Sequence, residues 1–475
     1  MRILLINPPY LFEFYQETTI PVGLAYIASY LRRNHEVRII DLNVEKVTKE
    51  GFENILKNFK PDFVGFSVTT PIFSTCTKIA NLIKKINKNI RIIFGGPHPT
   101  ALPEETLLNS CIDYVVIGEG EKTIVELVNV VEKGKTLKKV RGIGYKKDNK
   151  VVITKHRPLI KDLDELSFPS FNLFPLSKYT GSGFRNGFYS VTSRGCPYSC
   201  IHCAAHLTFG KKIRRRSIKN VIQELKTLKK EYKIRWIKFY DDVFTIDKNY
   251  VINLCKEMIK QNLGISWWCN TRVDKVDENL LELMHKAGCE QIAYGIESGT
   301  QRILNYMKKG TYVEQADRAI KMSRKIGIIP SGYFMVNFPT ETKEEIKATL
   351  NMAQKIGVTY FRISMATPYP LTELWERCVK YNLMRDLDNY SKYGYLQNML
   401  ITNKEISKKE LKKMVKYTNL KMFLRPVWFI DSFKSLLKGL IKTKKIKLPL
   451  VNVINYYKNI YHFSSDNTEV FIKRA

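Results

Sequence analysis

Short apolar runs alternate with amphipathic stretches over the first 150 residues of the chain. This alternation is typical of a parallel sheet whose strands are joined by crossover helices. Apolar residues recur at helical spacing between the runs, for example over residues 24–33 and 76–86. The runs expected to form strands are residues 3–6, 37–40, 63–66, 90–94 and 114–117. The pattern predicts a doubly wound, Rossmann-like α/β domain over residues 1–150.

Small and polar residues follow the last three of these predicted strands. In open α/β sheets, ligands bind at the carboxyl ends of the strands, where such loops gather. The pattern therefore predicts a ligand-binding edge. The candidate residues are Ser67, Thr69, Gly95, Gly96, Gly118 and Glu119.

A second α/β alternation occupies residues 188–395, after a stretch rich in proline and aromatic residues at 151–187. We expect that stretch to form a strap packed across both domains. Six strand and helix units predict a partial (β/α)6 barrel of the TIM type, with its active site at the carboxyl ends of the strands. The strands are expected at residues 188–192, 236–240, 265–269, 291–294, 329–336 and 361–365. Residues 396–475 are basic and predict a small helical tail.

The formal charge of +33 is spread along the whole chain of 475 residues. Because the lysines form no single patch with aromatic residues, we interpret the charge as compositional bias and expect no nucleic acid partner. The cysteines are odd in number, nine, which suits a reducing cytoplasm better than a disulfide framework.

The tail contains one stretch with the character of a membrane-surface helix. Residues 428–441 place apolar side chains at near-helical spacing, and lysines follow. An amphipathic helix of this kind predicts peripheral membrane contact. The alternative is a helix packed against the barrel with a solvated basic face. No apolar run is long enough to span a bilayer.

Three cysteines lie close together directly after the first predicted barrel strand. Cys196, Cys200 and Cys203 form a Cys-x3-Cys-x2-Cys array. Thiolates favour iron and zinc, and three of them can hold three corners of an iron–sulfur cubane while one iron stays open. The alternatives are a zinc knuckle or an accidental grouping. We interpret the neighbouring His202 as a packing residue.

The array and its surroundings resemble the radical SAM superfamily, in the branch that carries an N-terminal cobalamin-binding domain. That branch includes the anaerobic magnesium-protoporphyrin ester cyclase and many methyltransferases. The matching segments occur in the family's order, and the resemblance covers about residues 1–395. They are residues 194–198, 239–242, 270–274, 295–299 and 332–335. The chain departs from the family at Asn337, Thr340 and Leu371, where glycines are usual.

The resemblance implies a 4Fe–4S cluster on the three cysteines, with S-adenosylmethionine on the open iron. Asp241 or Asp242 would accept a hydrogen bond from the ammonium group of S-adenosylmethionine, and Arg272 would pair with its carboxylate. Glu297 matches a position that contacts the ribose hydroxyls. Each assignment has a structural alternative: an acid at a helix N-terminus, an ion pair of Arg272 with Asp274, and a tight turn around Glu297.

The resemblance also implies cobalamin at the edge of the N-terminal sheet. The Asp-x-His-x-x-Gly motif that supplies a histidine to cobalt is absent, and His98 lacks its spacing. The resemblance therefore implies cobalamin bound without a protein histidine on cobalt. The six loop residues of the predicted edge would then hold the nucleotide tail and the corrin edge. The alternative is a vestigial domain without cofactor.

The function that the resemblance implies is cleavage of S-adenosylmethionine to a 5′-deoxyadenosyl radical and methylation of an unactivated carbon. The partners would be a small-molecule or lipid substrate and an external electron donor such as flavodoxin or ferredoxin. A radical cyclase or oxidoreductase of the porphyrin-ester type would share these motifs. A tRNA methylthiotransferase is disfavoured. That class uses three further N-terminal cysteines and ends in a small RNA-binding barrel, whereas here only Cys76 and Cys111 precede the array and the tail is predicted to be helical.

Overall fold

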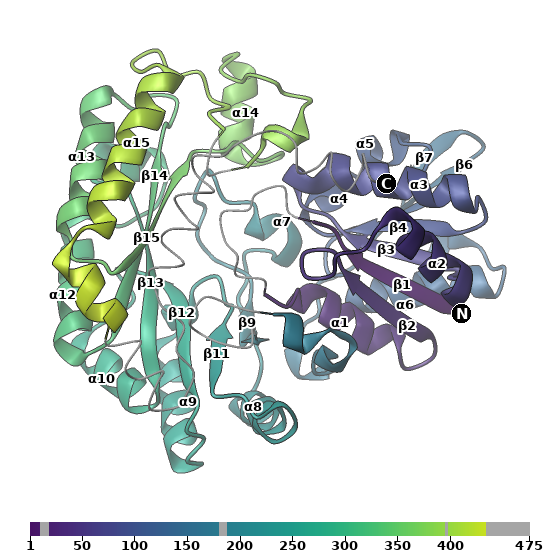
Figure 1. The fold of residues 1–475 in the computed structure, drawn as a ribbon, viewed down its shortest axis with the longest axis horizontal. Coiled ribbons are helices and arrows are strands. Elements are labelled where there is room, and N and C mark those ends of the chain that lie inside the picture. The colour runs from purple at the N-terminus through teal and green to yellow at the C-terminus, as the bar shows by residue number, and fades with distance from the viewer. Residues whose placement is uncertain (10–18, 180–187, 395–397, 434–475) are drawn as a thin grey trace.

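The structure is a computed structural model that describes residues 1–9, 19–179, 188–394 and 398–433. Two α/β units lie side by side (Figure 1). The N-terminal unit contains one sheet with helices on both faces. The second unit contains a curved parallel sheet with helices on its outer side.

The N-terminal sheet contains the five predicted parallel strands in the order β2-β1-β3-β4-β5. This order places a topological switch point between β1 and β3, where ligands bind in folds of this type. The strands are β1 (Arg2–Asn7), β2 (Glu36–Asp41), β3 (Phe63–Ser67), β4 (Arg91–Gly95) and β5 (Tyr114–Val116).

Two antiparallel strands, β6 (Ile143–Lys147) and β7 (Lys150–Ile153), extend this sheet beyond the prediction. Asp148 and Asn149 connect them, with φ angles of 50° and 59°. Two successive residues at positive φ are typical of a tight hairpin turn, for which Asp and Asn are favoured. The sheet therefore continues into residues 151–153, which were expected to belong to the strap.

Helices cover both faces of the N-terminal sheet, which confirms the doubly wound prediction. One face packs against α1 (Val22–Leu31) and α6 (Glu121–Glu132), and this core continues into the barrel. The other face packs against α2 (Lys49–Phe59), α3 (Phe73–Ile86) and α5 (Pro103–Leu108) in a separate core that also includes Tyr390 and Tyr393. The remaining helix of this domain is α4 (Pro97–Ala101).

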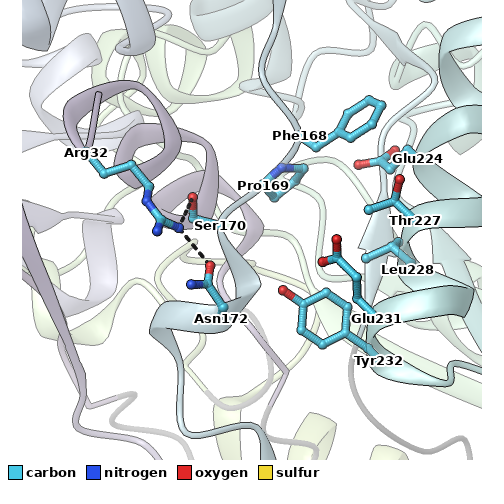
Figure 2. A pocket seen from close by; sticks show the side chains of 10 residues that line it. All are labelled: Arg32, Phe168, Pro169, Ser170, Asn172, Glu224, Thr227, Leu228, Glu231 and Tyr232. Atoms are coloured by element: carbon cyan, nitrogen blue, oxygen red, sulfur yellow. Dashed lines mark hydrogen bonds between the residues drawn. The ribbon is translucent and has the colours of Figure 1, made fainter. Parts of the chain in front are cut away.

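The strap lies between helix α1 of the first domain and helix α8 (Ile218–Tyr232) of the second, as Figure 2 shows around Phe168 and Pro169. Ser170 N donates to Ala25 O of α1 at 3.0 Å, and Arg32 donates to Asn172 Oδ1 at 2.8 Å. On the other side, the buried Phe171 ring packs against Tyr232 of α8. The strap thus contacts both domains.

The second domain is an open sheet of six parallel strands in the order β15-β14-β13-β12-β11-β8. This is the predicted partial barrel. The strands are β8 (Tyr189–Ser190), β11 (Trp236–Phe239), β12 (Ser266–Arg272), β13 (Cys289–Glu297), β14 (Ile329–Val336) and β15 (Tyr360–Met365). A short antiparallel pair, β9 (Ser193–Arg194) and β10 (Arg214–Arg215), brackets the cysteine loop and the short helix α7 (Ala205–Phe209).

The barrel helices lie on the outer side of this sheet, and its inner side faces α7 and the N-terminal domain (Figure 1). Apolar side chains of the helices, such as Leu254 and Ile320, share one buried core with outward side chains of the strands, such as Trp267. The outer helices are α8, α9 (Lys248–Lys260), α10 (Glu278–Lys286), α12 (Val313–Ile326), α13 (Lys343–Lys355) and α15 (Lys408–Phe423). Helices α11 (Gln301–Tyr306) and α14 (Glu373–Lys380) instead pack with Ile201 of the cysteine loop in a small separate cluster.

The first helix of the tail is α15, which packs against α13 and is followed by helical residues at 426–433. Trp428 is only 6% exposed and lies against Phe423, and Asp431 forms an ion pair with Arg324 at 2.9 Å. This part of the predicted surface helix therefore packs against the barrel, whereas residues 434–441 lie outside the described residues. Among the described helices, none combines the length and the apolar character that crossing a membrane requires.

Candidate active site

The cysteine loop lies between β9 and α7, at the carboxyl edge of the barrel sheet. Cys196, Cys200 and Cys203 are half-buried. Ile201 ties the loop to two other elements, because its N–H donates to Met307 O at 3.0 Å and its carbonyl accepts from Leu374 N at 2.8 Å. Gly195 before the first cysteine has φ 94°, and a Cβ there would lie 2.4 Å from Lys212 O. Only glycine fits this approach.

The three thiols and Asp242 influence one another electrostatically. Burial, together with the nearby Asp242, Cys200 and Cys196, raises the pKa of Cys203 to about 11. Burial raises the pKa values of Cys196 and Cys200 as well. In the described part of the chain, no three His, Cys, Asp or Glu side chains gather to hold a single metal ion. A cubane takes one thiolate at each of three irons, which this array can supply, whereas a closed zinc site needs four ligands.

Asp241 and Asp242 follow β11, but their surroundings differ. Asp241 is buried and accepts hydrogen bonds from Thr192 N at 3.1 Å and from Ser193 Oγ at 2.6 Å. Its carboxylate is thus bound to the strand that leads into the cysteine loop. Asp242 is open to solvent on the site surface, but protein atoms crowd its carboxyl group, and this partial desolvation together with Asp241 raises its pKa to about 6. Of the two, Asp242 is the carboxylate that faces the thiols.

Arg272 ends β12, and its guanidinium is surrounded by the protein's own acceptors. It pairs with Asp274 at 2.8 Å and donates to the carbonyl oxygens of Lys309 at 2.6 Å and Gly310 at 3.0 Å. The Cζ atom of its guanidinium lies 3.7 Å from the centroid of the Tyr198 ring, inside the cysteine loop. These contacts match the ion-pair alternative. They also let Arg272 support the cysteine loop, through its contact with Tyr198.

Glu297 ends β13 in a left-handed conformation, with φ 69°. Its carboxylate pairs with Lys309 at 2.8 Å, and both side chains are about 90% buried. Cys200 and Glu297 both raise the pKa of Lys309, against the effect of burial. A buried ammonium therefore lies beside the cysteine array. Sequence reasoning missed it because nothing distinguishes Lys309 from the other basic residues of this chain.

The loop after β14, where the chain departs from the family, contains two unusual polar groups. Asn337 adopts φ 74°, and Glu341 is fully buried. Burial raises the pKa of Glu341 to about 8, and its carboxyl group accepts a hydrogen bond from Phe338 N at 3.0 Å. His202 lies nearby with its ring 6.1 Å from that of Phe338, and burial lowers its pKa to about 4. His202 is thus a neutral packing residue, as expected.

The predicted ligand edge of the N-terminal domain lies at the switch point of its sheet. Ser67 pairs in register with Gly95, which brings the loops after β3 and β4 together. The side chains of Ser67 and Thr69 are half-buried and form no hydrogen bond with a described residue. A Cβ at Gly118 would meet nothing within 4 Å. Free hydroxyls beside open backbone fit a polar cofactor tail.

Gly96 has a different reason to be glycine. Its φ is 102°, and a Cβ there would lie 3.0 Å from both N and O of Val68. The close approach is thus between two loops of the protein itself.

His98 is fully buried behind this edge. Its ring lies 4.2 Å from Phe73 and 4.8 Å from Tyr390, and neither ring nitrogen has a hydrogen-bond partner among the described residues. Burial lowers its pKa to about 4. A side chain enclosed by two aromatic rings suits packing, in keeping with the expectation that His98 does not bind cobalt.

Glu119, the last of the predicted edge residues, lies in a buried ion network between the two domains. Its carboxylate accepts from Arg194 and Arg214, each at 2.9 Å, and from Ile160 N at 2.7 Å. Arg194 also pairs with Glu121. Arg194 is two residues before Cys196, so this network joins the edge of the N-terminal sheet to the cysteine loop.

Comparison with known proteins identifies both domains. Residues 13–128 match the B12 binding domain family, and residues 190–353 match the Radical SAM superfamily. The chain is 39% identical over 430 residues to uncharacterized methyltransferase PH0819 of Pyrococcus horikoshii, covering 90% of this chain and 93% of that protein. It is 31% identical over 366 residues to anaerobic magnesium-protoporphyrin IX monomethyl ester cyclase of Rubrivivax gelatinosus, covering 75% and 66%.

The fold is also that of a solved structure. The methyltransferase TsrM from Kitasatospora setae, with cobalamin and a [4Fe-4S] cluster bound, superposes with a TM-score of 0.70 at 18% identity, covering 90% of this chain and 89% of that one. The chain therefore belongs to the radical SAM enzymes with an N-terminal cobalamin-binding domain, and its cofactors are a 4Fe–4S cluster, S-adenosylmethionine and cobalamin.

Proposed function

We propose that this enzyme methylates an unactivated carbon of a small molecule. The observation that carries the proposal is the buried network of Glu119, Arg194 and Arg214. It holds the cysteine loop directly beside the carboxyl edge of the cobalamin-binding domain. Methyl transfer needs this proximity, because the radical and the methyl donor must reach the same carbon.

The residues of the site have distinct tasks in this proposal. Cys196, Cys200 and Cys203 hold the cluster, and Asp242 accepts a hydrogen bond from the ammonium of S-adenosylmethionine. Arg272 positions the loop through Tyr198. When bound, the cluster with S-adenosylmethionine supplies a carbon-centred radical, and cobalamin supplies the methyl group. The barrel and the docked N-terminal domain exclude water from the reacting atoms.

Glu297 and the edge residues are proposed as cofactor contacts. Glu297 can bind the ribose hydroxyls only while Lys309 holds it in place. Ser67 and Thr69 offer hydroxyls to the nucleotide tail of cobalamin. Gly118 leaves the backbone open to the corrin edge, and Gly95 would contact it through its backbone, since a Cβ at Gly95 would point at Val116, 3.7 Å away.

Incubation with deuterated-methyl S-adenosylmethionine tests the reaction itself. The cofactor-loaded enzyme, dithionite as reductant and a small-molecule extract of the source cells should yield a product that carries the deuterated methyl group. The label distinguishes methylation from the second candidate, a radical cyclase, which the similarity to the ester cyclase favours. A new product without the label would establish cyclase or oxidoreductase chemistry and refute methylation.

The methylthiotransferase alternative gains no support from the N-terminal cysteines. Cys76 and Cys111 are both buried in the core of the N-terminal domain. Burial raises the pKa of each thiol, which disfavours the thiolate form that binds iron.

Binding of hydroxocobalamin tests the proposed edge. Thr69→Trp should weaken binding by roughly tenfold or more, because the indole would fill space proposed for the cofactor. Lys88→Trp, exposed before β4 at the opposite edge, is the matched control and should bind like the wild type. Gly96→Trp is a poor test, since it would disrupt the β3–β4 loops themselves. Equal affinity of Thr69→Trp and the control would place cobalamin elsewhere.

A further inference from the structure

The short segment between α11 and α12 connects the cysteine loop to two strands of the barrel. Met307 O accepts a hydrogen bond from Ile201 N of the cysteine loop at 3.0 Å. Lys309 O accepts one from the guanidinium of Arg272, at the end of β12, at 2.6 Å. Lys309 Nζ forms an ion pair with Glu297, at the end of β13, at 2.8 Å. The backbone and the side chain of Lys309 are thus fixed relative to the cysteines.

The ion pair of Lys309 and Glu297 lies directly over Gly295 of β13. A Cβ at Gly295 would lie 2.6 Å from Glu297 Oε1 and 2.8 Å from Lys309 Nζ, so the glycine leaves the room that the pair occupies. Gly295 pairs in register with Arg272, whose guanidinium contacts the Tyr198 ring of the cysteine loop. The pair therefore lies at the level of the sheet from which the cysteine loop is supported.

The charges of this pair act on Cys200. The side chains of Lys309 and Glu297 are 9% and 11% exposed, and water screens buried charges far less than exposed ones. Burial raises the pKa of the Cys200 thiol, whereas Lys309 lowers it and Glu297 raises it, with the effect of Lys309 the larger of the two. Arg272 also lowers this pKa, but less. The net effect of the pair at Cys200 is thus that of a positive charge.

Reduction by the external donor adds one electron beside these thiolates and leaves the charge of Lys309 unchanged. The reduction potential of a cluster depends on the charges and hydrogen bonds around its sulfur atoms. A cation favours the more negative, reduced state, and its effect is strong where the dielectric constant is low.

We propose that the ammonium of Lys309 raises the reduction potential of the cluster, and that Glu297 keeps this ammonium charged and in place. Lys309 is then a positioned charge that eases the first electron transfer, and it touches neither the substrate nor the reacting carbon. The inference concerns the activation of the enzyme, so it holds whether the product is methylated or cyclised.

A redox titration of the reconstituted cluster, followed by electron paramagnetic resonance, tests the proposal without substrate or turnover. Lys309→Met keeps the length of the side chain and removes its charge. It should disfavour reduction by roughly tenfold, which is a shift of about 59 mV to more negative potential for one electron. Lys309→Arg keeps the charge and should stay close to the wild type. A purely structural role predicts the reverse order, because the larger guanidinium disturbs the packing more than Met does.

Lys308→Met is the matched control. Lys308 is the adjacent residue and carries the same charge, but its side chain is 50% exposed and pairs with Glu373. Water and salt screen such a charge, so the potential of this variant should equal that of the wild type. A wild-type potential in Lys309→Met, or an equal shift in Lys308→Met, would overturn the proposal.

A double variant separates charge from packing. Lys309→Met leaves the carboxylate of Glu297 buried without its cation, and Glu297→Gln in the same chain removes that charge as well. The potential of the double variant should lie between those of Lys309→Met and the wild type, because the net effect of the pair at Cys200 is positive. A potential at or below that of Lys309→Met would show that packing causes the shift and would refute the proposal.

Glu297→Gln alone provides the comparison if Lys309→Met fails to hold the cluster, as its iron content would show. It differs from the double variant only at Lys309, so its potential should be the higher of the two. Equal potentials, or the reverse order, would show that the charge of Lys309 has no effect on the cluster.

Discussion

Cys196→Ala should abolish both the iron–sulfur cluster and the cleavage of S-adenosylmethionine. After anaerobic reconstitution, the wild-type chain should hold one 4Fe–4S cluster, measured by iron and sulfide content and by visible absorption. With one thiolate removed, only two ligands remain for a cluster that already has one open iron. Production of 5′-deoxyadenosine in the presence of dithionite should therefore fall to background.

Cys111→Ala is the control for this experiment, because Cys111 is also a cysteine but lies buried in the N-terminal domain. It should keep the cluster and the cleavage activity. A stoichiometric zinc ion in the native protein, without iron-dependent absorption, would contradict the cluster assignment. Cluster retention by Cys196→Ala would contradict the assignment of this cysteine as a ligand.

Glu119→Gln should lower the free energy of unfolding by about 3–5 kcal/mol, the usual cost of removing one partner from a buried ion pair. Arg194 and Arg214 are 6% and 8% exposed, so their charges cannot be solvated when the carboxylate is lost. The amide would also present its own N–H donors to guanidinium donors. Denaturant unfolding followed by circular dichroism measures the change.

Glu165→Gln provides the contrast. Glu165 pairs with Lys122, but its side chain is 52% exposed, and exposed ion pairs contribute less than about 1 kcal/mol. We expect almost no shift of its unfolding midpoint. Because Arg194 leads into the cysteine loop, Glu119→Gln should also lose its reconstituted cluster faster than Glu165→Gln. Equal stability of the two variants would show that the interdomain network contributes little.

The sequence alone determined the architecture. Alternation of apolar runs and amphipathic stretches predicted all the parallel strands of both sheets, because burial of a parallel sheet on both faces requires that pattern. It missed the β6–β7 hairpin, whose Asp148-Asn149 turn is a short local signal. The cysteine spacing indicated the cluster, since ligands on one short loop are close whatever the fold.

Only the tertiary structure decided which polar groups are free to bind a ligand. Asp241, Arg272 and Glu119 all stand at strand ends, where the sequence predicted ligand contacts. Their hydrogen-bond partners include Thr192, Gly310 and Ile160, which are distant in the chain.

The same limit applies to the buried cation. Lys309 beside the cysteines looks like the other basic residues of the chain until its burial and its ion pair with Glu297 are known. Register and packing are set by long-range contacts of the whole sheet, and local sequence does not encode them.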